Sequence, residues 1–126
     1  MPSLSPHFRL EELACRCGCG GEAQPEILAN LTRVVLMLER VRLAIGHKPI
    51  RITSGYRCAK HNKAVGGRPQ SLHLTGRAAD IQVDDLLPSQ LQAIVIKSVP
   101  EAHGIGRHAR FTHLDVRGFR LIFDYS

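Results

Sequence analysis

With 126 residues, 44% of them hydrophobic, the chain can bury one core but not two, so we expect a single domain over residues 1–126. The formal net charge of +6 suits acidic partners, but the chain has four Phe, two Tyr, no Trp and no block of consecutive Lys or Arg. This composition offers neither base-stacking platforms nor a phosphate track, so we expect no nucleic-acid partner. No hydrophobic run approaches transmembrane length.

The N-terminal segment, residues 1–24, contains three of the four cysteines. Residues 8–13 read as a short helical turn, and Cys15, Cys17 and Cys19 follow in a loop broken by glycines. With the distant Cys58 they are compatible with a second thiolate metal site, with a disulfide pair or with reduced thiols, and the CxxC spacing of many structural zinc sites is absent. The sequence leaves these three alternatives open.

A long helix follows, and it begins at Pro25, a residue suited to the first helical position. Gly46 and Pro49 end it. Apolar residues recur at helical spacing along one face, which predicts a core helix: Ile27, Leu28, Leu31, Val34, Val35, Leu38 and Val41.

The second half of the chain alternates short strands with one further helix. Strands are expected at residues 50–53, 78–83, 104–106 and 111–116, with an edge strand within 119–123, and a helix at 88–99. A tight connection joins the strands at 104–106 and 111–116. Helices against mostly antiparallel strands imply an α+β domain.

The most informative segment is the run from Ser71 to Asp80, with the sequence Ser-Leu-His-Leu-Thr-Gly-Arg-Ala-Ala-Asp. His73 lies in a polar stretch that ends at Gly76, and the next residues alternate as a half-buried strand does. A glycine makes a chain reversal inexpensive. We therefore expect the chain to turn at Gly76 and bring Asp80 back beside His73.

A second histidine and a second aspartate lie in the strand at residues 111–116. Alternation along this strand puts Phe111, His113 and Asp115 on one face, so that an imidazole and a carboxylate stand side by side. His73, Asp80 and His113 together offer two nitrogens and one oxygen to a divalent metal and leave a fourth position for water. That is the ligand count of a catalytic zinc site with one ion.

Three segments resemble the signature motifs of the zinc D-alanyl-D-alanine carboxypeptidases, which share the hedgehog/DD-peptidase fold. They read Ser54-Gly-Tyr-Arg57, Ser71-x-His73-x-x-Gly76-x-Ala78-x-Asp80 and His113-x-Asp115-Val-Arg117-Gly118, and the resemblance runs from about residue 8 to 123. It implies an antiparallel sheet that carries the zinc site, with His73, Asp80 and His113 as ligands. It further implies that Arg57 anchors the terminal carboxylate of the substrate and that Ser71 supports the first ligand or the bound peptide.

The general base is less clearly marked. Asp115 is the first candidate because it shares a strand face with His113, but it can equally serve as an ion-pair partner of Arg117 that orients the ligand. Many relatives carry a histidine two residues before the last ligand or a glutamate three before it, where this chain has Phe111 and Arg110. His108, in the preceding loop, is the second candidate, as an acid or an oxyanion donor.

The resemblance implies a zinc metallopeptidase of bacterial peptidoglycan whose partner is a D-amino-acid-containing stem peptide. We expect a D-alanyl-D-alanine carboxypeptidase; a cell-wall endopeptidase and a non-catalytic zinc-dependent binding module are the alternatives. The first residues lack the basic start and apolar core of a signal peptide. We therefore expect a protein that is made in the cytoplasm and acts in the cell wall after delivery by another route. We also expect a monomer of the small, phage-like type.

Overall fold

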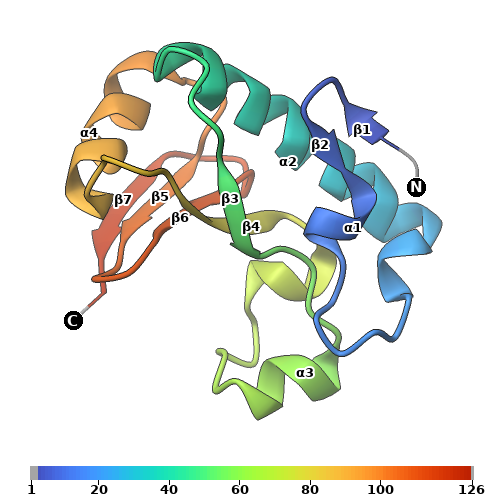
Figure 1. Cartoon of the computed structure of the whole chain (residues 1–126). Helices are drawn as coiled ribbons and strands as arrows, with labels where there is room; N and C mark the ends of the chain where they lie inside the picture. The colour runs from blue at the N-terminus through green and yellow to red at the C-terminus, as the bar shows by residue number, and fades with distance from the viewer. Residues whose placement is uncertain (1–2, 126) are drawn as a thin grey trace.

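The computed structural model describes residues 3–125, and a mainly antiparallel five-stranded sheet forms its centre (Figure 1). The strand order is β3-β4-β6-β5-β7, and only the edge pair β5 and β7 is parallel. The strands are β3 (Arg51–Ser54), β4 (Ala78–Gln82), β5 (Gly104–Arg107), β6 (Thr112–Asp115) and β7 (Leu121–Asp124). The expected α+β class is confirmed.

Two helices, α2 (Pro25–Ala44) and α4 (Pro88–Ser98), pack against each other and against the sheet. Both begin with proline, as the sequence predicts. The α2 stripe is confirmed, with Leu31, Val34, Val35, Leu38 and Val41 buried. Its apolar face meets Ile81, Ile105 and Leu114 of the sheet in one core.

The pairing of β4 with β6 separates an apolar face of the sheet from a polar one. Ala79 lies opposite Leu114 and joins the core beneath the helices, whereas Asp80 lies opposite His113. Successive side chains of a strand point to opposite faces, so Asp80 and His113 share the face away from the helices. This register brings two of the three expected ligands together.

The remaining elements are short and lie outside the five-stranded sheet. A small hairpin, β1 (Ser3–Ser5) and β2 (Phe8–Arg9), precedes α1 (Leu10–Leu13), so the predicted helical turn starts two residues late. Three short helices were assigned to no element by the sequence analysis: η1 (Gly21–Ala23), α3 (Ala59–Ala64) and η2 (Leu72–Thr75). Within residues 3–125 no helix is both long and apolar enough to cross a membrane.

Candidate active site

His73 is placed by the short helix η2. The Ser71 hydroxyl accepts a hydrogen bond from the His73 backbone N–H at 3.2 Å, which caps the helix, and Gly76 ends it in the left-handed conformation at φ 72°. The chain then enters β4, where Asp80 lies. The expected reversal at glycine thus brings Asp80 to the imidazole of His73. Ser71 contacts the backbone of His73, and its contact with a bound peptide remains a prediction.

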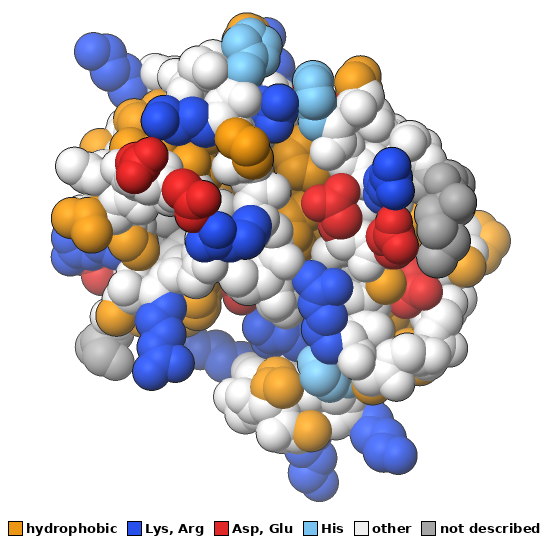
Figure 2. Space-filling view, viewed as in Figure 1, with side chains coloured by type: hydrophobic (Ala, Val, Ile, Leu, Met, Phe, Trp, Pro, Cys, Tyr) orange, Lys and Arg blue, Asp and Glu red, His pale blue; other side chains and the backbone are white. Residues whose placement is uncertain are grey.

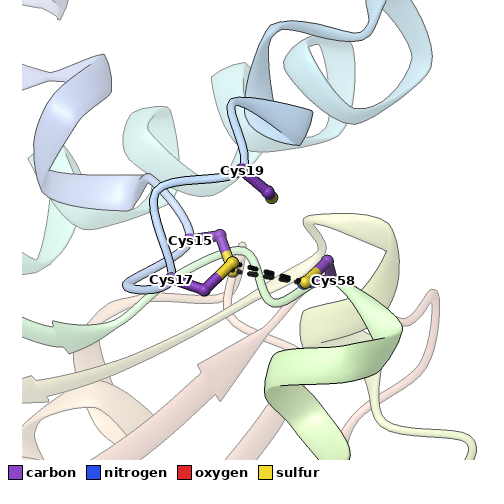
Figure 3. Close-up of side chains that lie close together, drawn as sticks. All are labelled: Cys15, Cys17, Cys19 and Cys58. Carbon is purple, nitrogen blue, oxygen red and sulfur yellow. Dashed lines mark hydrogen bonds between the residues drawn. The ribbon is translucent and has the colours of Figure 1, made fainter.

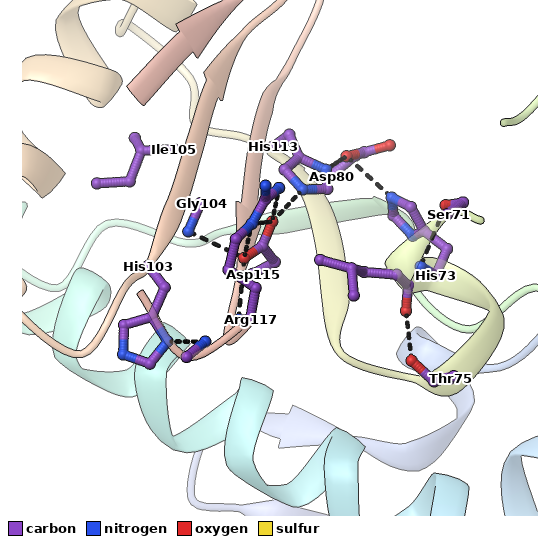
Figure 4. A network of polar contacts seen from close by, with 12 residues as sticks. Ser71, His73, Thr75, Asp80, His103, Gly104, Ile105, His113, Asp115 and Arg117 are labelled. Carbon is purple, nitrogen blue, oxygen red and sulfur yellow. Dashed lines mark hydrogen bonds and ion pairs between the residues drawn. The ribbon is translucent and has the colours of Figure 1, made fainter. Parts of the chain in front are cut away.

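Three side chains converge on one point of the polar face (Figure 4). Asp80 Oδ1 lies 3.3 Å from His73 Nε2 and 3.0 Å from His113 Nδ1, and all three residues are buried. Ligand atoms about 2.0–2.1 Å from a tetrahedral zinc lie about 3.3 Å from one another. The spacing and the donor set therefore fit a zinc ion bound between them.

The second nitrogen of each imidazole already has an acceptor. His73 Nδ1 lies 2.7 Å from the carbonyl oxygen of Gly55, and His113 Nε2 lies 2.8 Å from Asp115 Oδ2. With a metal bound, each acceptor would hold the proton on that nitrogen and leave the lone pair of the other nitrogen for the ion. Histidine ligands of zinc are oriented in this way.

Burial and hydrogen bonding act in opposite directions on these groups. Burial raises the pKa of Asp80, but hydrogen bonds with His113 and His73 outweigh it and hold the pKa well below the ordinary value. Burial lowers the pKa of His113, but the hydrogen bonds to Asp115 and Asp80 raise it overall. Asp80 is thus ionised at neutral pH, as a metal-ligating carboxylate must be.

Asp115 lies beneath His113, fully buried, with all of its partners donating to it. Oδ1 accepts from the N–H groups of Gly104 at 2.9 Å and Arg117 at 3.1 Å, and Oδ2 accepts from the Arg117 guanidinium at 2.7 Å. Burial raises its pKa, but the hydrogen bonds from His113 and Arg117 lower it well below the ordinary value. These contacts correspond to the orienting alternative, and the assignment of Asp115 as general base remains a prediction.

Arg57 borders the metal-binding group from the loop after β3. Its guanidinium donates to Ser54 Oγ at 3.0 Å, to Asn62 Oδ1 at 3.2 Å and to Asp80 Oδ2 at 3.4 Å. The side chain is 15% exposed. Three contacts thus orient the partly accessible guanidinium of Arg57 next to the metal-binding Asp80. Its role as the anchor of the substrate carboxylate remains a prediction.

His108 lies on the same face of the sheet, at the turn between β5 and β6. Gly106 pairs with His113, and His108 follows Gly106 by two positions, so its side chain points to the polar face. Its ring stacks on Phe111 with centroids 4.2 Å apart, and Nδ1 accepts from the Arg110 N–H at 3.1 Å. Stacking on Phe111 therefore holds His108 in place.

Three contributors to this site were missed by sequence reasoning. Asn62 carries no metal or nucleophile signature, and Tyr125 lies after the last predicted strand. Tyr125 packs edge-on against His108 with ring centroids 5.2 Å apart, and burial together with the charge of Asp80 raises the pKa of Tyr125 to about 12.

Gly104 is the third contributor, because it leaves room for the Asp115 carboxylate, which a Cβ at this position would strike. The Gly-Ile-Gly pattern was the only available signal for that contact.

The surface around α3 is rich in positive charge. Figure 2 shows a hollow between the lobe that contains α3 and the rest of the molecule, with Lys and Arg side chains at its edges. Such a border favours the approach of an anionic ligand.

Two comparisons with known proteins bear on this geometry. The model of the Peptidase M15 family matches residues 6–115. A zinc D-Ala-D-Ala carboxypeptidase of Streptomyces albus G is 40% identical over 53 residues, which is 42% of this chain and 21% of that protein. The alignment therefore spans about a fifth of the relative. The His73, Asp80 and His113 group has the donors and spacing of a zinc site. Since the family model covers most of the chain, this protein belongs to the Peptidase M15 family.

Proposed function

We propose that this peptidase is a D-alanyl-D-alanine carboxypeptidase that acts on the stem peptides of peptidoglycan, in the cell wall. The observation that carries the proposal is the position of Arg57, whose guanidinium lies 3.4 Å from the metal-binding carboxylate of Asp80. A cation this close to the expected reaction centre suits a substrate whose free carboxylate lies one residue from the bond to be cut. The partial relative named for D-Ala-D-Ala supplies the substrate class.

Arg57 is suited to this task because it is oriented before substrate arrives. Its hydrogen bonds to Ser54, Asn62 and Asp80 occupy three of the five N–H groups of a guanidinium. The remaining N–H groups can pair with a carboxylate, and a charge-assisted pair of this kind is about twice as strong as a neutral hydrogen bond. Preorganisation reduces the entropy lost on binding.

A bound zinc supplies Lewis-acid polarisation of the scissile carbonyl and activation of water. The chain's own residues hold the geometry: Ser71 and the Gly55 carbonyl orient His73, and Asp115 orients His113. We assign the proton transfer to His108 rather than Asp115. Asp115 has no exposed surface, and its carboxylate is surrounded by the N–H donors of Gly104, Arg117 and His113. His108 is partly exposed and keeps its Nε2 for exchange.

The proposal is tested with a soluble muropeptide that ends in D-Ala-D-Ala, by measuring released D-alanine. The zinc-loaded protein should cleave it, and an otherwise identical peptide with an amidated C-terminus should be cleaved far more slowly. Arg57→Lys keeps the charge but loses the planar fork, so kcat/KM for the free acid should fall about 10–100-fold, an effect of about 1.4–2.8 kcal/mol, with zinc content unchanged.

The matched control is Arg33→Lys, the same exchange at an exposed position of α2, and it should leave kinetics unaltered. Equal cleavage of the amidated and free peptides would refute the role of Arg57 as carboxylate anchor. Cleavage of cross-linked muropeptide dimers without release of D-alanine would identify an endopeptidase. Binding without any cleavage would identify a zinc-dependent binding module.

A further inference from the structure

Four cysteine side chains form a second cluster, separate from the zinc-binding group described above (Figure 3), with Cys17 and Cys19 exposed, Cys58 half-buried and Cys15 buried. Cys15, Cys17 and Cys19 come from the loop between α1 and η1, and Cys58 comes from the start of α3. Their sulfur atoms all lie within 4.8 Å of one another. The sequence separation of Cys58 from the others, 41 residues from Cys17, shows that tertiary folding brings the fourth thiol to the first three.

Three of the sulfurs lie at distances near those between thiolate ligands of one metal ion. Cys15 Sγ lies 3.2 Å from Cys17 Sγ and 3.8 Å from Cys58 Sγ, and Cys17 Sγ lies 3.5 Å from Cys58 Sγ. Four thiolates about 2.3 Å from a tetrahedral zinc lie about 3.8 Å apart. Disulfide sulfurs are about 2.0 Å apart and pair two by two, whereas here one sulfur is near several others.

The surrounding backbone is arranged to receive thiolates. Three N–H groups point at sulfur, each at 3.4 Å: Cys58 N–H at Cys15, His61 N–H at Cys58 and Gly21 N–H at Cys19. Hydrogen bonds of this kind stabilise the negative charge that sulfur carries when it binds a metal. Gly18, between Cys17 and Cys19, and Gly20, directly after Cys19, have φ of 77° and 76°, a left-handed conformation that turns the loop on either side of Cys19.

We propose that Cys15, Cys17, Cys19 and Cys58 form a second, closed zinc site of four thiolates with a structural role. On binding, each thiol loses its proton to solvent, and no oxidant or reductant is required. The site leaves no position open for water or substrate, in contrast to the three-residue group of the peptidase site.

The location of this site explains what it would stabilise. Cys58 directly follows Arg57, and the same loop is held to the N-terminal segment by the hydrogen bond from Tyr56 N–H to the Leu13 carbonyl at 2.8 Å. Gly55, whose carbonyl orients His73, packs against the Leu13 backbone, where a Cβ would clash. A metal that joins the cysteine loop to Cys58 would therefore fix the segment that carries Arg57 and the support of His73.

The test is metal analysis of the full chain purified under reducing conditions. We expect two zinc ions per chain in the wild type and four thiols that react with a thiol reagent only after unfolding in chelator. Cys17→Ser should bind one zinc and retain the peptidase-site ion, and His113→Ala should bind one zinc and retain protected thiols. Each variant is thus the control for the other.

Cobalt substitution provides a readout that does not depend on activity and that the wild type alone can give. The cobalt-loaded wild type should show the intense near-ultraviolet charge-transfer absorption of cobalt bound by thiolates, and His113→Ala should keep it. One zinc per chain in the wild type without that absorption, or an intact mass two hydrogens short for each cysteine pair, would overturn the proposal. Either result leaves the proposed peptidase function to be judged separately, by release of D-alanine.

Discussion

Replacing Asp115 by Asn distinguishes an orienting carboxylate from a general base. In the wild type both oxygens accept only, from Gly104 and Arg117 at Oδ1 and from Arg117 and His113 at Oδ2. Asparagine keeps one oxygen, but its amide group faces the donors of Arg117 and His113. The substitution therefore removes the ion pair with Arg117 and places the amide N–H group against the N–H donors of Arg117 and His113, in a fully buried position.

The expected magnitude follows from that burial. Breaking a buried ion pair costs about 3–5 kcal/mol, so the free energy of unfolding of the zinc-free protein should fall by that amount in urea denaturation. His113 loses the acceptor that fixes its tautomer, so zinc affinity should fall about 10–100-fold in a chelator competition assay. The matched control is Asp84→Asn, which breaks the exposed pair with Arg51 and should change stability by at most about 1 kcal/mol.

The opposite pattern would refute this reasoning. If Asp115 is the general base, kcat should fall about 10²–10⁴-fold in Asp115→Asn at saturating zinc, while zinc affinity and the free energy of unfolding stay at wild-type values. An unchanged zinc affinity alone would already exclude Asp115 as the residue that orients His113.

Two further substitutions test other parts of the structure. His108→Gln keeps a polar side chain in the β5–β6 turn but cannot carry the proton. Turnover of the muropeptide should therefore fall about 10²–10⁴-fold, with zinc content retained. A rate within about a factor of three of the wild-type rate would show that His108 takes no part in the reaction. Glu39→Gln weakens the contacts of Glu39 with Ser5 Oγ at 2.6 Å and with the backbone N–H of His7 at 2.8 Å, which hold the β1–β2 hairpin on α2. Burial raises the pKa of Glu39, but the hydrogen bonds from Ser5 and His7 outweigh burial and lower the pKa below its ordinary value of 4.5. The contribution of Glu39 to the free energy of unfolding is therefore full above pH 4.5 and is lost as the pH falls through the lower pKa of the folded state. The variant should therefore be about 1–3 kcal/mol less stable than wild type at pH 7 in urea denaturation, with a difference that shrinks in acid, and a difference independent of pH would contradict this account.

The local parts of the site could be predicted from sequence because their geometry depends on nearby residues. Gly76 lies three residues from His73 and four from Asp80, so a single turn joins the two ligands. Alternation along β6 is a property of any strand, and it places His113 and Asp115 on one face whatever surrounds them. The apolar stripe of α2 likewise predicted its own burial, because a periodic face of that length must be covered.

Short polar elements could not be predicted in the same way. The helix α3 has six residues and no apolar stripe, and its N-terminus is capped by Cys58, whose sulfur accepts from the His61 N–H. Isolated helices of this length are unstable, so its existence depends on contacts with the rest of the chain. Asn62, which it carries, reaches Arg57 only because α3 is held in that place.

The sequence by itself determined which side chains can bind a metal, but only the tertiary structure determined what each one faces. Strand periodicity puts Asp115 beside His113, yet the donors of Gly104 and Arg117 that surround it come from the neighbouring strand β5 and from the chain beyond β6. The cysteines show the same division: their spacing was compatible with a metal site, a disulfide or free thiols. The fold brings Cys58 within 3.8 Å of Cys15 across 43 residues of chain, a proximity that arises from packing and not from any local pattern.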